Sequence, residues 1–254
     1  MGKLCWIANV ASWLVVTSFT GVAAFSAKKK SRWGTFPDEP LAVESGLRER
    51  GYRYVIGSDE AGRGCLAGPV VAASCCLLVD DLATHRPIQG VTDSKALTAQ
   101  ERERIYEEMV ESPDYSWNWA EKSNLQINDS NIQIATMECF AESVEGLVNM
   151  ANLPVEKSYS IIDGKKNAKL SGAAKGLSCR PWVKGDANVY TVALASIVAK
   201  VTRDKIMVEE AHKKYPQYGF DKNKGYGTRD HVVAIHTHGP SPIHRMSFKA
   251  LKDR

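Results

Sequence analysis

Two adjacent acids, Asp59 and Glu60, stand where an apolar run that is typical of a buried strand comes to its end. Acids this close repel one another, which raises their pKa values, and a divalent cation bound between them removes the repulsion. Acids on a surface or at a helix cap are the alternative interpretation. Because the run before this pair is apolar, we favour a functional role for the pair.

Two further acids occupy similar positions. Asp163 precedes Gly164 at the end of a second short apolar run, and Asp186 follows Gly185 just before a helix. Taken alone, Asp163 is typical of a turn and Asp186 of a helix N-cap. If the two strands are neighbours, however, three or four carboxylates meet at one end of the sheet. Carboxylates without a His or Cys cluster suit Mg²⁺ or Mn²⁺, and two such ions would support hydrolysis of a phosphodiester.

A glycine-rich turn, GRG at residues 62–64, comes directly after Asp59 and Glu60. Because two of its three residues lack a side chain, its backbone N–H groups can approach a ligand closely. A tight turn with a solvated arginine is the other interpretation. The position of the turn, next to two candidate metal ligands, favours a ligand-binding role.

The elements that must position these residues follow from the hydrophobic pattern. We expect strands at residues 52–58, 69–79, 115–122 and 159–162, and a further short strand that begins at residue 182. Helices are expected at residues 99–111, 128–150, 187–215 and 229–238. A capping box at residues 98–101 opens the first helix, whose inner side should carry Ile105, Met109 and Val110. This order of elements predicts an α/β sandwich with a helical C-terminal region.

The net charge is unevenly distributed along the chain. Residues 1–179 carry 19 basic and 22 acidic side chains, whereas residues 180–254 carry 14 basic and 7 acidic ones. The basic C-terminal third indicates either a polyanionic partner such as nucleic acid or a solvated, lysine-rich helix face. The six cysteines form no C-x-x-C pair, so we expect reduced thiols and neither a disulfide framework nor a zinc site.

The N-terminal segment differs from the rest of the chain. Residues 1–24 combine Lys3, no acid and an apolar stretch that ends in small residues, which is typical of a signal peptide cleaved after Ala24. Phe25 and the basic residues 26–32 follow, and this two-part arrangement resembles the targeting segments used by complex plastids of algae. We therefore expect a targeting segment at residues 1–45, a plastid location and no stable membrane association after processing. A retained signal anchor and a mis-started gene, whose product would be cytoplasmic, are the alternatives.

Several motifs in the folded part resemble those of ribonuclease HII. They run in the family's order over residues 52–248, which is nearly the whole folded part. The motifs are GSDEAGRGCLAGPVVAA at 57–73, TDSK at 92–95, DG at 163–164, VKGD at 183–186, ASIVAKVTRD at 195–204, YPQYGFDKNKGYGT at 215–228 and HRMSF at 244–248.

The resemblance implies a ribonuclease H-like fold in residues 46–254, with a mixed five-stranded sheet flanked by helices and a C-terminal helical region. It also implies an endonuclease that degrades the RNA strand of RNA–DNA hybrids and nicks 5′ of single ribonucleotides in duplex DNA. The products would carry 3′-hydroxyl and 5′-phosphate ends, and Mg²⁺ or Mn²⁺ would be the cofactor, with two ions during catalysis.

Carried over motif by motif, Asp59, Glu60 and Asp163 would ligate metal, and Asp186 would be the fourth acid of the site. The turn residues Gly62, Arg63 and Gly64 would contact the ribonucleotide, with backbone groups that test its 2′-hydroxyl.

The remaining contacts implied by the resemblance involve the sugar at the junction and the phosphates. Tyr226 would pack on the junction sugar and favour a deoxynucleotide beside the ribonucleotide; a half-buried packing tyrosine is the alternative. Phosphate contacts, or otherwise solvated charges, are expected of Ser94, Lys95, Lys184, Ser196, Lys200 and Lys224. No histidine is expected to act as a base, because two-metal hydrolysis needs none.

Some features separate this chain from its relatives. The sister family, ribonuclease HIII, usually lacks the GRG pattern and carries an additional N-terminal domain, and the nuclear enzyme of eukaryotes needs two partner subunits. The CLAGPVVAA stretch resembles the bacterial enzymes, so we expect no obligatory protein subunit. The loop at residues 167–178 is longer than the bacterial one. A hybrid-binding protein without catalysis and a DNA nuclease of the same fold are the competing functions.

Overall fold

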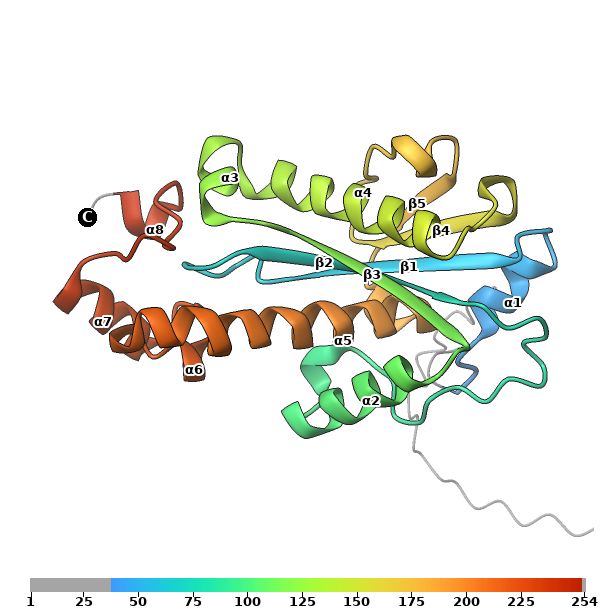
Figure 1. The fold of residues 1–254 in the computed structure, drawn as a ribbon, viewed down its shortest axis with the longest axis horizontal. Coiled ribbons are helices and arrows are strands. Elements are labelled where there is room, and N and C mark those ends of the chain that lie inside the picture. Colours follow the sequence, from blue (N-terminus) through green and yellow to red (C-terminus); the bar gives the residue numbers. More distant parts are fainter. Residues whose placement is uncertain (1–37, 253–254) are drawn as a thin grey trace, which may run out of the picture. The chain divides into compact units, whose positions relative to one another are not determined.

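The computed structural model describes residues 38–252. Its centre is one five-stranded sheet with the strand order β3-β2-β1-β4-β5 (Figure 1). The strands are β1 (Tyr54–Ala61), β2 (Val70–Leu77), β3 (Tyr115–Lys122), β4 (Ser158–Asp163) and β5 (Ser178–Trp182). Strands β1, β2 and β3 pair antiparallel, whereas β4 pairs parallel with both β1 and β5. The expected mixed five-stranded sheet is therefore confirmed.

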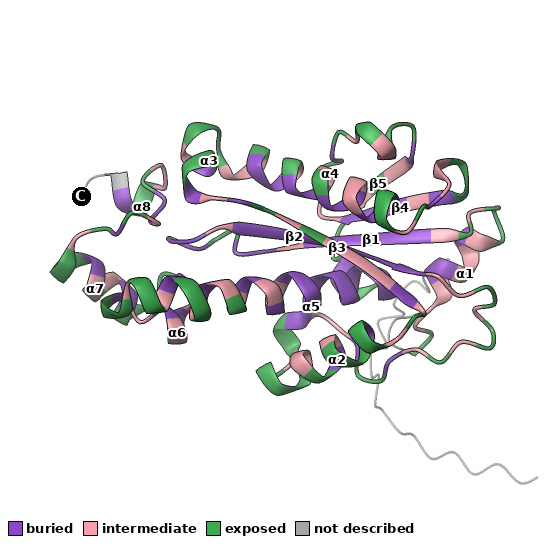
Figure 2. Cartoon of the chain, viewed as in Figure 1, coloured by how far each residue is buried: buried purple, intermediate pink, exposed green. Residues whose placement is uncertain are grey.

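Helices cover both faces of this sheet (Figure 1). On one face lie α3 (Asn124–Asp129) and α4 (Ile132–Met150), and on the other lie α5 (Tyr190–Lys205) and α2 (Ala99–Glu111). The smaller helices are α1 (Ala42–Arg48), α6 (Phe220–Asn223), α7 (Arg229–His238) and α8 (Lys249–Lys252). Strand β2 is buried along all eight of its residues, as its nearly continuous apolar sequence requires of a strand covered on both sides (Figure 2).

Four expectations about single elements were wrong. The helix expected at 128–150 is two helices, because the Asn131 side chain accepts hydrogen bonds from the N–H groups of Gln133 and Ile134 and so starts α4 anew. The helix expected at 187–215 begins at Tyr190 and changes to a π-helix from Ile206 to His212. The last strand ends at Trp182 instead of beginning there. Val110 is 47% exposed, whereas Ile105 and Met109 are buried as expected.

Helix α1 lies partly in the segment that we expected to be outside the fold. Its Val43 is buried in a cluster with residues of β1, β4 and α5. The carboxylate of Glu44 accepts hydrogen bonds from the N–H and the hydroxyl of Thr191, at 2.9 and 3.0 Å. Helix α5 has no capping side chain of its own, so Glu44 takes that role. Folded structure therefore begins before residue 46.

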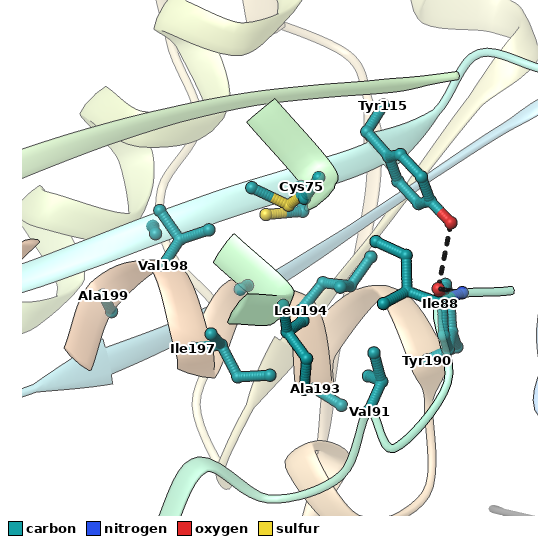
Figure 3. Packing of buried hydrophobic residues seen from close by; sticks show 14 of the residues in the cluster. Cys75, Ile88, Val91, Tyr115, Tyr190, Ala193, Leu194, Ile197, Val198 and Ala199 are labelled. Carbon is teal, nitrogen blue, oxygen red and sulfur yellow. Dashed lines mark hydrogen bonds between the residues drawn. The ribbon is translucent and has the colours of Figure 1, made fainter. Parts of the chain in front are cut away.

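Helix α5 is anchored to the sheet by a large apolar cluster, shown in Figure 3. Inside the cluster, the hydroxyls of Tyr115 on β3 and Tyr190 on α5 lie 3.0 Å apart, and the Tyr190 hydroxyl accepts the N–H of Ile88 at 2.8 Å. These bonds satisfy polar groups that burial would otherwise leave without a partner. The apolar cluster and these bonds fix α5 against the sheet, which matters because the second half of the helix carries Lys200, a residue that lines the candidate site.

The structure also shows the state of the cysteines and the apolar character of the helices in the described residues. Their five cysteines, Cys65, Cys75, Cys76, Cys139 and Cys179, are all unpaired, while Cys5 lies outside the described part. Among residues 38–252, no helix has both the length and the apolar character that a bilayer crossing requires.

Candidate active site

Three carboxylates meet at one end of the two central parallel strands. In the β1–β4 ladder Ser58 lies opposite Ile162, so the next residues, Asp59 and Asp163, emerge side by side. Oxygens of Asp59, Glu60 and Asp163 all lie within 4.8 Å of one another. The convergence that the sequence predicted is confirmed for these three acids.

Nearby cations balance the charges of these acids only in part. Asp59 is 5% exposed, and burial raises its pKa well above the usual range, with Glu60 and Asp163 adding to the effect. Burial likewise raises the pKa of Glu60, which the Arg63 charge partly offsets. The pKa of Asp163 is raised by burial, although the Gly185 N–H, which donates to its Oδ1 at 2.7 Å, opposes the rise. Clustered, repelling oxygen ligands of this kind fit a hard divalent cation.

Asp186 borders this cluster without belonging to its closest set of oxygens. It lies in the short turn Gly185–Ala187, and the N-cap position of α5 is Val189, so Asp186 does not cap that helix. Its Oδ2 is 3.5 Å from the Lys95 Nζ. The N–H of its neighbour Gly185 donates to the Asp163 Oδ1, which places Asp186 beside the cluster, and its charge adds to the raised pKa values of Asp59 and Asp163.

The GRG turn follows at once and has two unlike glycines. Gly62 has a φ of +86°, and a Cβ added there would lie 1.8 Å from the Nε of Arg203. A Cβ added to Gly64 would meet nothing within 4 Å. Between them, the Arg63 guanidinium donates to the Gln133 side chain at 2.7 Å and lies 3.5 Å from the Glu60 carboxylate. The fold therefore requires a glycine at position 62, whereas the glycine at position 64 leaves open space beside the backbone.

Two buried arginines, Arg203 and Arg245, hold the segment after the turn through its carbonyls. Arg203 on α5 donates to the carbonyls of Pro69 and Ala67, and also to that of Lys224, at 2.9, 3.1 and 2.9 Å. Arg245 donates to the carbonyls of Gly68 and Arg63 at 2.9 and 3.0 Å, and burial lowers its pKa to about 10. Both side chains are fully buried.

Sequence reasoning missed both arginines, although a signal for one of them existed. Arg203 continues the α5 face of Ser196 and Ala199 at helical spacing, and that face points into the protein. An arginine on a buried face is rarely accidental, because burying its charge is costly without hydrogen bonds. Gln133, the partner of Arg63, gave no comparable signal.

Asp59, Glu60 and Asp163 share one cleft of about 400 Å³ with the GRG turn, whereas Asp186 does not line it. The other expected site residues that line it are Ser94, Lys95, Lys200 and Tyr226. Tyr226 is 39% exposed, and the Lys200 Nζ and the Arg203 guanidinium lie 5.4 and 5.7 Å from the centre of its ring.

Three expected phosphate contacts do not line this cleft. Ser196 is buried, where its hydroxyl accepts the Ser94 N–H and donates to a carbonyl of its own helix. Lys184 is exposed next to the turn that holds Asp186. The Lys224 Nζ donates to the Asp221 carbonyl. Ser196 thus holds the backbone of Ser94, which does line the cleft, through a hydrogen bond.

Comparisons with known proteins identify the family of the chain. A family model described as Ribonuclease HII matches residues 56–251. A ribonuclease HII of Caldicellulosiruptor bescii is 40% identical over 206 residues, which are 81% of this chain and 91% of that protein. A ribonuclease HII of Ralstonia nicotianae is 41% identical over 213 residues, 84% of each chain.

Solved structures share the fold. One is the structure of the PCNA:RNase HII complex from Archaeoglobus fulgidus, with a TM-score of 0.59 and 25% identity over 77% of this chain and 95% of that chain. Another is Bst-RNase HIII in complex with Mn²⁺, which at 20% identity and a TM-score of 0.59 over 84% of this chain and 72% of that one is similar in fold. The chain belongs to the ribonuclease HII family, whose members are hydrolases that cut the RNA strand of RNA–DNA hybrids internally.

Proposed function

We propose that this enzyme nicks duplex DNA on the 5′ side of a single embedded ribonucleotide, in addition to degrading the RNA of hybrids, and that it leaves 3′-hydroxyl and 5′-phosphate ends. Roles in ribonucleotide excision repair and in RNA primer removal would follow from this chemistry. The observation that carries the proposal is one cleft that contains the acids, the GRG turn and Tyr226. A group for cleavage and groups for recognising one nucleotide are thereby adjacent.

The acids suit two ions of Mg²⁺ or Mn²⁺. Asp59, Glu60 and Asp163 would hold them, with Asp186 as a further ligand at the border of the cluster. When bound, such ions supply the positive charge that makes a water molecule a better nucleophile and that stabilises the departing oxygen of a phosphodiester.

The chain's own residues would bind and orient the substrate. Lys95 and Lys200 bring positive charge to the cleft, which suits the phosphates on either side of the bond to be cut. The open space beside Gly64 allows the backbone to approach a ribose, whose 2′-hydroxyl is the feature that distinguishes RNA from DNA. The exposed Tyr226 ring offers a flat surface for the sugar of the following deoxynucleotide.

The experiment uses the full chain and duplex DNA that carries one ribonucleotide, with an all-DNA duplex as the control. We expect a nick 5′ of the ribonucleotide that requires Mg²⁺ or Mn²⁺ and is lost in Asp59→Asn. Salt-sensitive binding without cleavage at any metal concentration would instead support a binding protein. Equal cleavage of the all-DNA duplex would indicate a DNA nuclease.

We further propose that the enzyme needs no obligatory protein subunit and that residues 1–45 direct it to a plastid. The first proposal is supported by a cleft whose acids, turn and lysines all come from this one chain. The second is supported by the two-part N-terminal segment, whose residues 1–37 lie outside the described part. Fusing residues 1–45 to a fluorescent protein tests it, and a purely cytosolic signal would refute it.

A further inference from the structure

Two buried histidines lie behind the loop that carries Tyr226. His231, on α7, and His244, in the segment before α8, are 0% and 1% exposed. Their Nε2 atoms are 3.1 Å apart. Neither belongs to the acid cluster or lines the cleft, so the proposed hydrolysis gives them no role.

The hydrogen bonds at the two ends of the pair determine where its protons lie. The Ser241 main-chain N–H donates to His244 Nδ1 at 2.8 Å, so this nitrogen accepts and the His244 proton is on Nε2. At the other end, His231 Nδ1 lies 2.8 Å from the Tyr226 carbonyl, which can only accept, so the His231 proton is on Nδ1. The His244 Nε2–H therefore donates to His231 Nε2, and both rings are neutral.

The aromatic surroundings keep the two histidines neutral and hold their rings in place. The rings of Tyr218 and Phe220 contact the two imidazoles edge-on or tilted, with centroid distances of 5.0 Å from Tyr218 to His244 and 5.3 Å from Phe220 to His231. Burial in this apolar pocket lowers the pKa of both histidines, that of His244 to about 4. A further proton would also place two N–H groups face to face between the rings.

The pair connects the two loops that line the cleft. On the side of His244, the next residue, Arg245, donates to the Arg63 carbonyl in the GRG turn at 3.0 Å. On the side of His231, the chain of bonds ends at the Tyr226 carbonyl. Since both ends are main-chain groups, a shift of one loop relative to the other would break the sequence of bonds.

We propose that His231 and His244 are positioning residues, which form a hydrogen-bond relay of fixed tautomers that sets Tyr226 relative to the GRG turn and so sets the preference for an RNA–DNA junction. The inference rests on the proposed role of Tyr226 as the residue that meets the junction sugar. Neither histidine exchanges a proton with the substrate.

The first test measures the tautomers directly in the full wild-type chain at neutral pH. In ¹⁵N-histidine NMR spectra we expect His231 as the Nδ1–H tautomer and His244 as the Nε2–H tautomer, with assignment by His231→Phe and His244→Phe. His236, which is exposed, is the control for a histidine outside the pair. A protonated pair at neutral pH, or His231 as the Nε2–H tautomer, would overturn the relay. This readout does not depend on activity.

The second test compares kcat/KM on duplex DNA with one ribonucleotide and on a continuous RNA–DNA hybrid. The ratio of the two values cancels any difference in the folded fraction of a variant. We expect His231→Phe, which keeps an aromatic ring against Phe220, to lower the ratio about tenfold, the effect of losing roughly one hydrogen bond. The ratio for His236→Phe should equal that of the wild type.

The results separate this inference from the proposed function. A ratio within twofold of the wild-type value in folded His231→Phe would refute the positioning role while leaving the nuclease proposal intact. A wild-type enzyme that nicks neither substrate would refute the proposed function and the junction preference together. The tautomers would even then decide whether the relay exists.

Discussion

The two glycines of the GRG turn should respond oppositely to the same substitution. Gly62 has a left-handed backbone, which costs a residue with a Cβ about 1–2 kcal/mol. The added methyl group would also lie 1.8 Å from the Arg203 Nε, inside a side chain that is fully buried and cannot swing into solvent. Gly62→Ala must therefore displace a guanidinium that three carbonyls hold in place.

The size of the effect follows from these contacts. A hydrogen bond from a charged donor contributes about 1.5–3 kcal/mol, so losing one of them and adding the backbone strain gives a total of about 3–5 kcal/mol. Proteins of ordinary stability unfold at a cost of only about 5–15 kcal/mol. For a chain of this length, we expect the melting temperature of Gly62→Ala to fall by roughly 6–20 °C.

Gly64→Ala is the matched control, because it adds the same methyl group two residues away in open space. Its free energy of unfolding should stay within about 0.5 kcal/mol of the wild-type value. Its kcat/KM on a single embedded ribonucleotide should nevertheless fall, since the methyl group would occupy the space beside the backbone. Thermal and urea unfolding of the full-length variants measures the first effect, and nicking assays measure the second. Equal melting temperatures for the two variants would refute this reasoning.

Three further predictions concern buried titratable groups. Asp59→Asn removes a source of repulsion, so its free energy of unfolding in the presence of EDTA should equal or exceed the wild-type value. Metal-dependent cleavage by this variant should be lost. A large drop in melting temperature would contradict this prediction. The pKa values of His231 and His244 are lower in the native chain than in the unfolded chain, so at acidic pH the unfolded chain binds more protons. The stability that the two histidines contribute is therefore complete above about pH 6.5 and declines as the pH falls toward 4. Urea unfolding at a series of pH values should therefore show a smaller loss between pH 6.5 and 4 in the double Phe variant than in the wild type. Glu44→Ala removes the cap of α5 and should cost about 1–2 kcal/mol in the same assay, and an unchanged melting temperature would rule out the capping role.

Local patterns in the sequence predicted much of the fold. The capping box at residues 98–101 and the strand at 115–122 appear at the expected positions, since each depends on neighbours within a few residues. The meeting of Asp59 with Asp163 could also be predicted, because strand ends are visible in the hydrophobic pattern. That prediction still required two strands, about 100 residues apart in the chain, to be neighbours in the sheet.

What could not be predicted depends on partners that are distant in the chain. Glu44 looks like an ordinary acid near a terminus until Thr191, 147 residues away, is found beside it. Arg245 donates to the carbonyl of Gly68, which lies 177 residues earlier in the chain. The residues around Gly68 give no indication that this carbonyl needs a donor. A main-chain acceptor has no sequence signature, so side chains that serve the backbone are the hardest functional residues to recognise.

The choice of partners for the two buried arginines explains how the acids remain available. Among residues 38–252, neither Arg203 nor Arg245 forms an ion pair, and both guanidinium groups donate hydrogen bonds to carbonyls. Had either guanidinium paired with Asp59, the pKa of that carboxyl would be lowered, and the pair would compete with a metal ion for the same oxygens. The pKa of Asp59 is instead raised, so its charge is left for a cation that binds from the cleft. Carbonyl partners thus let the protein place fixed positive charge beneath the GRG turn without neutralising the acids in front of it.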